Sequence, residues 1–503
     1  MLWPVPCDLR WAVLPAARRL PAPEPPGYRR RRPEESVLYE ALRAHLATFL
    51  ASCDEAGSGG LPAHVRGELE RFLTCGILAH GFVRVRCTTC RDDLLVAFSC
   101  RGRGFCPSCG GRRMADTAAR WSDRVLPHVP WRQWVLSLPF PLRFKAAWDP
   151  ELLTQLLKIF QAAIGMRLRA KARRRGLRAT RHGAVTVVQR FGGALNLNVH
   201  FHSMVADGVW VDSPRGPRFE PLRITEDDVR WVVCRVWRRA LRLSVVRDLF
   251  VADEERFADE CFVDEDRQLE LRLMDSSVRG RIGLGVNAGR PVRAEGRRLR
   301  RVKGEPRSRR AMQSELDGFD LQAAVRISRG DRLRLEHLSR YLLRPALATE
   351  RLELLEDGLY RYELKRSWAD GTRAFLFEPL ELVEKLAALI PIPRANLIRY
   401  HGVLAPASSW RAAVVPKFED KKSLLCLRGR PGVPSDRVPW AWLLRRVFLV
   451  EVLRCDRCGG RREVVAVTDP VAVPRVLAHL GLPTTGPQPD GARAPPQTDW
   501  LAS

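Results

Sequence analysis

The sequence predicts an α+β fold, in which an N-terminal helical and zinc-ribbon module precedes a domain with a central antiparallel sheet flanked by helices. Three observations predict it. Short apolar runs typical of strands alternate with amphipathic helical stretches over residues 126–400. The run VHFHSMVADGVWV looks like a hairpin about Ala206-Asp207-Gly208, which favours antiparallel pairing. Upstream, six cysteines gather within residues 75–115.

Composition divides the chain into five regions. Long helical patterns are expected over residues 151–175 and 227–250, and an Arg- and Gly-rich segment at about 276–312 is either a disordered insert or a basic arm. The predicted regions are a disordered Pro- and Arg-rich leader (1–34), a zinc-binding and DNA-binding domain (35–125), the α+β region (126–400), a C-terminal extension with a CxxC pair (401–484) and a disordered tail (485–503).

The charge points to a polyanionic partner. The 503 residues include 85 Lys and Arg against 57 Asp and Glu, a formal net charge of +28, and only nine of the basic residues are lysine. Arginine is suited to bidentate phosphate contacts, so nucleic acid is the first candidate. No run of 18 or more uncharged apolar residues is present, which argues against a membrane partner. Clustered cysteines without an export signal predict reduced thiols in the cytoplasm.

The cysteine spacing predicts a structural zinc site. Cys87/Cys90 and Cys106/Cys109 form two CxxC pairs with fifteen residues between them, which fits four thiolates around one tetrahedral zinc ion. A hairpin in the spacer would return the second pair. Four thiolates leave no open coordination position, so the zinc would be structural. The alternatives are a buried cluster of free thiols and, less favoured, a redox CxxC.

Other residues near these pairs have open assignments. Cys75, His80 and Cys100 could supply a second ion or a replacement ligand, or be core residues. Cys455 and Cys458 form a third CxxC, which is either a metal site completed by distant ligands or a turn with two free thiols. Arginines that flank the zinc pairs are candidate phosphate contacts, or a solvated basic face: Arg101, Arg103, Arg112 and Arg113.

A histidine pair and a tyrosine are the candidates for catalysis. His200 and His202 are separated by one residue, so on a strand both imidazoles point to the same face and could bind a divalent cation. Tyr341 lies in a helical stretch near Arg340 and Arg344, which would favour the phenolate and hold a phosphate. The alternatives are two surface histidines on an amphipathic strand and an ordinary half-buried tyrosine.

These residues together resemble the transposases of the insertion-sequence-91 family, within the HUH (His–hydrophobic–His) endonuclease superfamily. The resemblance covers residues from about 35 to 480. It is carried by FSCRGRGFCPSCGGRRMADTAA, VVQRFGGALNLNVHFHSMVADGVW, SRYLLRPAL and, most specifically, LKRSWADGTRAFLFEPLELVEKLAALIPIPRANLIRYHGVLAPASSWRAAVVP. It implies that residues 126–400 form the nuclease and transposase domain.

The resemblance also implies a rolling-circle type reaction on single-stranded element ends. Tyr341 would be the nucleophile, giving a 5′-phosphotyrosine and a free 3′-hydroxyl, and His200 and His202 would bind Mg²⁺ or Mn²⁺. Gln189 and His337 are the candidates for a third ligand. Many relatives have a second tyrosine four residues before the first, where this chain has His337. The chain thus looks like a single-tyrosine variant, which acts either sequentially or as a homodimer.

Competing functions remain at this stage. The first is a zinc-dependent DNA-binding protein without catalysis, in which the histidine pair is structural. The second is a metal nuclease that uses water as the nucleophile, and the third is a defective copy of a mobile element. The expected location is the bacterial cytoplasm, in association with the nucleoid.

Overall fold

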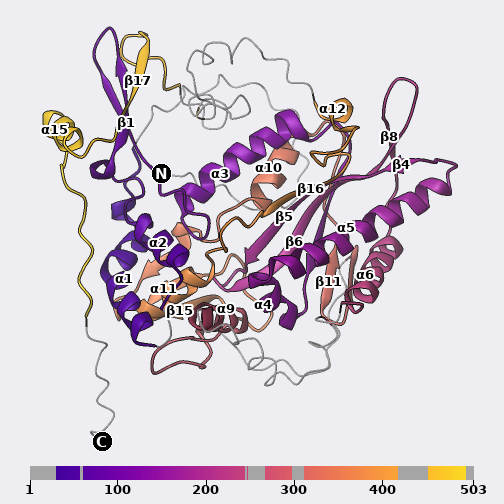
Figure 1. Ribbon diagram of the computed structural model, residues 1–503, viewed down its shortest axis with the longest axis horizontal. Coiled ribbons are helices and arrows are strands. Elements are labelled where there is room, and N and C mark those ends of the chain that lie inside the picture. Colours follow the sequence, from indigo (N-terminus) through magenta and orange to yellow (C-terminus); the bar gives the residue numbers. More distant parts are fainter. Residues whose placement is uncertain are drawn as a thin grey trace, which may run out of the picture. The chain divides into compact units, whose positions relative to one another are not determined.

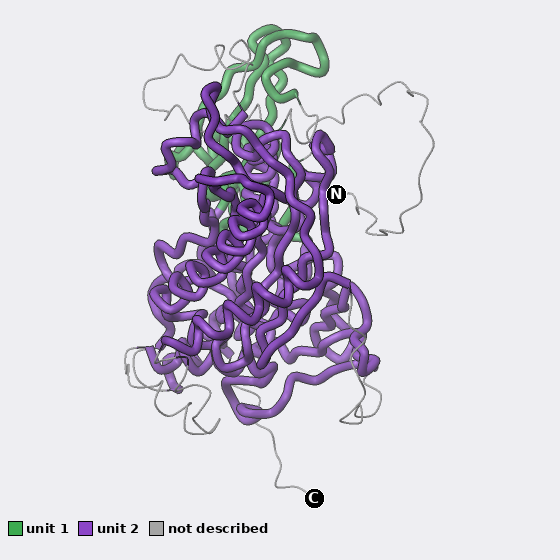
Figure 2. Tube along the Cα trace, turned by 90° about the vertical axis from the view of Figure 1, so that its right-hand side faces the viewer, with its two compact units in different colours: residues 1–35, 74–99, 426–487 green, residues 36–73, 100–425, 488–503 purple. Residues whose placement is uncertain are grey.

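The computed structural model describes residues 30–56, 60–243, 267–296, 311–416 and 451–493, together with Val246 and Leu444. The chain forms two compact units (Figure 2). The first comprises residues 1–35, 74–99 and 426–487, and the second comprises residues 36–73, 100–425 and 488–503. These units cut across the five regions expected from composition, because each is assembled from segments far apart in the sequence.

The first unit contains a three-stranded antiparallel sheet of order β17–β1–β2. Strand β1 (Phe82–Cys87) pairs with β2 (Asp93–Ala97) on one side and with β17 (Arg462–Val467) on the other. Apolar residues of η2 (Leu78–His80), β1 and α15 (Ala472–His479) share a small buried core. A C-terminal strand therefore completes an N-terminal hairpin. The short η1 (Pro33–Glu35) also lies in this unit.

The second unit is built on a seven-stranded sheet, and all its strand pairs are antiparallel, which confirms the predicted fold class (Figure 1). The order is β10–β11–β3–β6–β5–β16, with β12 also paired to β3. The strands are β3 (Trp131–Ser137), β5 (Gly183–Phe191), β6 (Leu197–Ala206), β10 (Gln313–Leu316), β11 (Phe319–Gln322), β12 (Arg326–Ile327) and β16 (Ile398–Gly402).

Helices cover both faces of this sheet, because its central strands are apolar on both sides. On one face, Val199, Phe201 and Val205 of β6 pack into a core with α4 (Phe140–Trp148), α5 (Pro150–Arg173), α6 (Glu226–Ala240) and α9 (Gln268–Arg279). On the other face, Met204 and Ala206 pack with η3 (Trp121–Val125) and α10 (Arg332–Leu342). Alternate side chains of β6 thus point to opposite faces of the sheet. We call the face covered by α5 the α5 face and the face covered by α10 the α10 face.

The remaining elements of this unit extend the sheet region. A four-stranded sheet has the order β13–β14–β15–β9, and a three-stranded sheet has the order β4–β7–β8. These strands are β4 (Thr180–Arg181), β7 (Gly208–Val211), β8 (Arg218–Pro221), β9 (Arg293–Glu295), β13 (Leu352–Leu354), β14 (Tyr360–Glu363) and β15 (Ala374–Phe377). The other helices are α1 (Val37–Glu55), α2 (Ala63–Phe72), α3 (Pro107–Arg120), η5 (Thr349–Arg351), α11 (Pro379–Ala388) and α12 (Arg411–Val414).

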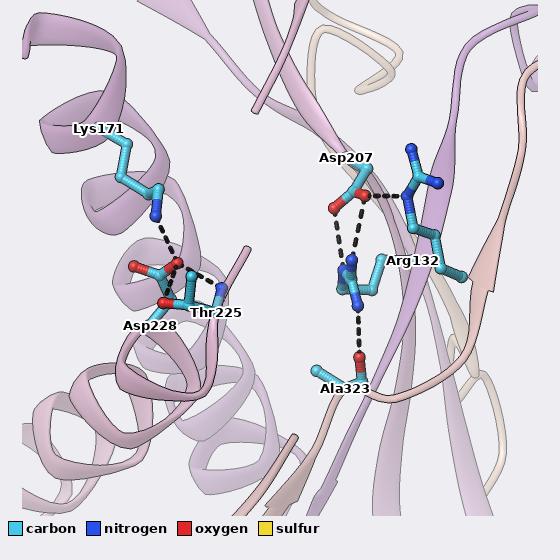
Figure 3. Close-up of polar contacts among 7 residues, drawn as sticks. Arg132, Lys171, Asp207, Thr225, Asp228 and Ala323 are labelled. Carbon is cyan, nitrogen blue, oxygen red and sulfur yellow. Dashed lines mark hydrogen bonds and ion pairs between the residues drawn. The ribbon is translucent and has the colours of Figure 1, made fainter. Parts of the chain in front are cut away.

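The hairpin predicted about Asp207 is wrong, although the antiparallel fold that it suggested is right. Strands β6 and β7 belong to different sheets, and the chain changes sheets at Asp207. The buried Asp207 carboxylate binds the guanidinium groups of Arg132 and Arg326, at 2.9 and 2.7 Å (Figure 3). This ion cluster fixes the crossing point.

The Arg- and Gly-rich segment is folded over its first half. Helix α9 ends at Gly280 in the left-handed conformation, and the Glu384 carboxylate accepts hydrogen bonds from the backbone N–H groups of Gly283 and Leu284. Strand β9 then pairs with β15. Residues 276–296 are therefore folded and form neither a disordered insert nor a basic arm. Residues 297–310 lie outside the described part of the chain.

The two predicted chain ends are described only in part. Arg30 forms an ion pair with Glu34, and residues 1–29 lie outside the described residues. In the tail, Asp490 binds the side chain of Arg43, and the backbone N–H of Arg493 donates to Thr48 Oγ1. Residues 488–493 are therefore held by α1, unlike the expected disorder, and residues 494–503 lie outside the description.

A buried carboxylate joins helices α5 and α6. Asp228, whose side chain is fully buried, accepts from Lys171 Nζ at 2.6 Å and from the Thr225 backbone N–H (Figure 3). It also accepts from Arg167 Nε at 2.6 Å. Burial alone would raise its pKa, but Lys171 and the other donors hold the pKa below its ordinary value of 3.8. Asp228 therefore caps α6 and pairs it with α5 at the same time.

Replacing Asp228 with Asn should lower the free energy of unfolding by about 3 kcal/mol, because it leaves two cations without their buried partner. The neighbouring Asp227→Asn is the matched control: its exposed pair with Arg230 is worth about 0–1 kcal/mol. Since the folded pKa is depressed, this stabilisation is present above the unfolded pKa of about 3.9 and is lost as the pH falls through the folded value. Urea unfolding at pH 7 and at lower pH tests both statements, and equal effects of the two variants would contradict them.

Candidate functional site

The histidine pair lies on the α10 face of the central sheet. Because side chains alternate along β6, His200 and His202 share this face with Met204. Their ring centroids are 4.8 Å apart. Burial, with a further contribution from the charge of Arg344, lowers the pKa of His200 to about 4 and that of His202 well below its usual value. Both imidazoles are therefore neutral at pH 7, the form that binds metals.

Each histidine is oriented by a hydrogen bond at Nδ1. Nδ1 of His200 lies 2.8 Å from the Asn198 carbonyl oxygen, so this nitrogen carries the proton and Nε2 is left with its lone pair. Nδ1 of His202 lies 2.9 Å from Nε2 of the Gln133 side-chain amide on β3. Turning this amide over places its oxygen at Nδ1, and His202 then adopts the same tautomer. Both Nε2 atoms can then act as ligands.

Gln189 lies beside the pair on the neighbouring strand. It is the register partner of His200 in the β5–β6 ladder, and its side chain is buried. Its amide nitrogen donates to the carbonyl oxygen of Leu342 at 2.6 Å, which ties it to the end of α10. Its Oε1 is buried and has no hydrogen-bond partner among the described residues. This orphaned acceptor next to His200 fits a metal ligand better than a core amide.

Tyr341 is presented by the last turn of α10. Asp331 caps the start of the helix by accepting from the Arg334 N–H, and the helix ends at Leu342, shortly before Pro345. Leu335 and Leu342 bury one side of α10 against the sheet. Tyr341 remains 42% exposed, and its ring centroid lies 6.3 Å from that of His202. The phenol is therefore accessible next to the histidine pair.

Cations surround the tyrosine. The guanidinium of Arg344 lies 4.5 Å from the centroid of the Tyr341 ring, and Lys365 Nζ lies 5.9 Å from it. Arg340 instead forms a 2.7 Å ion pair with Glu336, so it contributes less free charge. His337 is exposed on α10. The geometry therefore favours Arg344 over Arg340 as a phosphate contact and Gln189 over His337 as a third ligand.

A set of four cysteines closes within the first unit. Cys87 ends β1 and Cys90 follows it, Cys455 and Cys458 precede β17, and the four sulfurs lie within 4.8 Å of one another. The Cys87–Cys458 and Cys90–Cys455 sulfur distances are both 3.5 Å, close to the edge of about 3.8 Å for a tetrahedron with Zn–S bonds of about 2.3 Å. The backbone N–H of Cys90, then that of Thr89, lowers the pKa of the Cys87 thiol to about 6. The donor set fits zinc.

The predicted zinc set is therefore corrected. Cys87, Cys90, Cys455 and Cys458 together already form a complete set of four ligands. The predicted partners Cys106 and Cys109 belong to another group. In the second unit their sulfurs lie within 4.8 Å of each other and of Cys100. The Cys100–Cys109 distance is 3.5 Å, and the Gly102 N–H donates to Cys100. The hairpin lies within residues 82–97, with the first pair at its turn, rather than between the two pairs.

The four flanking arginines differ in their contacts. All four are exposed. Arg103 donates to the Ala395 carbonyl and Arg113 to the Gly102 carbonyl, so both hold the loop before α3. Arg101 and Arg112 are the better candidates for contacts to a polyanion.

Two residues of the site were not predicted. The sequence around Gln133 does not mark it as a site residue. A single glutamine in an apolar strand becomes relevant only because the neighbouring strand places His202 beside it. Lys365 lies 24 residues beyond Tyr341 and is brought to it by the fold. A search for polar residues on the strands next to the histidine pair would have suggested Gln133, but not Lys365.

Comparison with known families gives two matches. A transposase family model (Y2_Tnp) matches residues 183–411, which include His200, His202 and Tyr341. A model of the transposase zinc-binding domain (Zn_Tnp_IS91) matches residues 41–138, which include Cys75, Cys87, Cys90, Cys100, Cys106 and Cys109. No curated protein and no solved structure matches the chain. Within the described residues no helix has the length and apolar character to cross a membrane.

Proposed function

Because the chain belongs to the insertion-sequence-91 family of transposases, we propose that it cuts and rejoins single-stranded DNA at element ends through Tyr341. The observation that supports this most is the convergence of an exposed tyrosine, two neutral histidines and an orphaned amide oxygen at one point of the sheet. A structural histidine pair would not need an accessible phenol beside it.

In the first step the Tyr341 phenol gives up its proton to solvent, and its oxygen attacks the phosphorus. A tyrosine–phosphorus bond forms, the bond to the 3′ oxygen breaks, and that oxygen leaves with the electron pair and takes up a proton. Arg344 and Lys365, which lie 4.5 and 5.9 Å from the ring centroid, hold the negative phosphate against the nucleophile. The product is a 5′-phosphotyrosine and a free 3′-hydroxyl.

A divalent cation, Mg²⁺ or Mn²⁺, fits the donor set of His200, His202 and Gln189, and when bound it would supply a Lewis acid for a phosphate oxygen. The residues themselves prepare this site. The Asn198 carbonyl and the Gln133 amide fix the ring orientations, and burial keeps the imidazoles neutral. The Leu342 carbonyl holds Gln189 in place from the helix that carries Tyr341.

Rejoining has two routes in a chain with one such tyrosine. A 3′-hydroxyl can attack the phosphotyrosine, so that the new phosphodiester forms and Tyr341 leaves and regains its proton. Alternatively, two subunits of a homodimer each provide one tyrosine. Both routes need only one tyrosine per chain, and His337 stands where the second tyrosine of many relatives would be.

Zinc has a structural role in this family, and the first unit holds one complete set of four thiolates. The second unit supplies Cys100, Cys106 and Cys109 to another set. We propose that these three thiolates bind a second zinc ion, since thiolates are the usual ligands of structural zinc. The chain would then bind two zinc ions.

The test is a denaturing gel with a single-stranded element end labelled on its 3′ side and incubated with the protein and Mn²⁺. The proposal expects a labelled band that migrates with the protein and disappears after protease treatment. Cleavage without this adduct would indicate a nuclease that uses water. Binding without cleavage would indicate a zinc-dependent DNA-binding protein, and either result would contradict the proposal.

Gln133→Leu should weaken Mn²⁺ binding by about 10- to 100-fold, because His202 loses the group that orients its ring. Gln133→Glu should restore most of the affinity, since a carboxylate accepts from the same N–H. Calorimetric Mn²⁺ titration gives the affinities, and nicking at saturating Mn²⁺ should be nearly unchanged in both. If Glu restores the Mn²⁺ affinity, Gln133 does more than fill space. If both variants lose the same Mn²⁺ affinity, Gln133 is not a positioning residue.

A further inference from the structure

A second polar pocket lies in the same unit, at the other end of β5 from the site already described. It has a volume of about 370 Å³ and opens to solvent, and it is lined by Arg169, Thr180, Arg181, His182, Gly402, Ala405, Ala407 and Ser408. Gly183, next to the pocket, pairs with Gly402, whereas Gln189 pairs with His200. Six residues of strand, at about 3.3 Å each, separate the two ends by roughly 20 Å.

The pocket is lined by cations and by polar groups that have no partner. Arg169 comes from α5 and Arg181 from β4, and no acidic side chain lines the pocket. The buried Nε2 of His182 and the buried Oγ of Ser408 make no hydrogen bond to the described residues. Two guanidinium groups with two unsatisfied polar atoms form a set that fits an oxyanion.

The local fold holds these groups in place. The His182 ring lies against α5 at Gly165, where a Cβ would come within 2.7 Å of the ring. Gly402 has a φ of +60°, and a side chain there would collide with the His182 carbonyl. Arg181 stacks over Trp410, with its guanidinium carbon 4.4 Å from the ring centroid, and donates to Ser409. The positions of His182 and Arg181 are thus fixed before any ligand arrives.

His182 is neutral at pH 7, because burial, and after it the charge of Arg169, lowers its pKa to about 4. A neutral imidazole donates one hydrogen bond, as does the Ser408 hydroxyl. Both can serve an oxyanion between the two guanidinium groups. A cationic ligand would meet two positive charges and no carboxylate, so the charge of the pocket excludes it.

We propose that this pocket binds a backbone phosphate of the DNA strand at a point away from the phosphate that is cut. The family acts on DNA, and an open pocket admits a phosphodiester within a continuous strand. The proposal requires that the protein bind DNA, but it does not depend on the chemistry of Tyr341.

Arg169→Gln tests the proposal, with fluorescence anisotropy of a single-stranded element end measured at several salt concentrations. Affinity should fall about tenfold, the usual effect of losing one charge-assisted contact. The slope of log K against log salt should become shallower by about 0.7, the value for one phosphate contact on a single strand. Ser408→Ala should lower the affinity without changing the slope, because it removes no charge.

Arg178→Gln is the matched control, because Arg178 is exposed, lies two residues before Thr180 and does not line the pocket. Equal changes in Arg169→Gln and Arg178→Gln would overturn the proposal, since they would reflect net charge alone. Calorimetry with inorganic phosphate separates the two sources of the anion. Loss of phosphate binding in Arg169→Gln with unchanged DNA affinity would show a free-phosphate site and would also overturn it.

The experiment is independent of cleavage, so the two proposals can fail separately. If the unmodified chain forms no covalent adduct but Arg169→Gln still reduces the salt slope, only the tyrosine mechanism fails. If the adduct forms normally and the slope is unaffected by Arg169→Gln, only the pocket proposal fails.

Discussion

Tyr341→Phe is expected to abolish both strand cleavage and the covalent protein–DNA adduct, with a loss of about 10⁴-fold or more in the nicking rate. The substitution removes only the phenolic oxygen. The ring that contacts His202 and Arg344 is retained, so the local packing should be unchanged. Affinity for the single-stranded end, measured by anisotropy, should remain within about twofold, because the cations that bind phosphate are intact.

Tyr400→Phe is the matched control for this variant. Tyr400 lies on β16 of the same sheet, and its hydroxyl accepts a hydrogen bond from Trp121 at 3.0 Å, so its role is in packing. It should nick DNA at nearly the normal rate. Persistence of a protease-sensitive adduct in Tyr341→Phe would show that another residue is the nucleophile.

The second large effect is expected from Cys455→Ser. Loss of one thiolate from the closed set in the first unit should reduce bound zinc from two ions per chain to one, as measured by elemental analysis. Binding of structural zinc is worth on the order of 10 kcal/mol, so the β17–β1–β2 sheet should lose its stability. Hydrogen exchange should then show lost protection in residues 82–97 and 462–467, with β5 and β6 still protected.

Cys234→Ser provides the control, because Cys234 is a half-buried residue of α6 outside both cysteine groups. It should retain two zinc ions and normal exchange. Two zinc ions in Cys455→Ser, or protection lost equally in β5 and β6, would contradict the assignment of a separate zinc-stabilised unit.

The elements could be predicted from local pattern where one physical signal dominates. Apolar periodicity and end signals place α5 within two residues of the expected 151–175. The antiparallel class was also predictable, but the hairpin on which that prediction was based does not form. At Asp207 a buried ion cluster moves the chain to another sheet instead. Charged groups that interact across such long sequence separations leave no mark in a local window.

The same limit applies to the sites. His200 and His202 could be placed on one face because strand alternation is a local rule. Tyr341 could likewise be placed in a helical stretch. The zinc set was mispaired because spacing rules favour nearby cysteines, whereas Cys87 lies 371 residues from Cys458. Gln133 and Lys365 also depend on cross-strand and tertiary proximity, which the sequence alone does not encode in a readable form.

The pairing of β1 with β17 has a consequence for biosynthesis. The first two cysteines of this zinc set leave the ribosome long before the last two, which lie about 365–371 residues later. At a synthesis rate of about 5–20 residues per second, the early pair waits roughly 20–70 s for its partners. Capture of the metal in this unit thus reports that translation has passed residue 458, and a prematurely terminated chain cannot complete it.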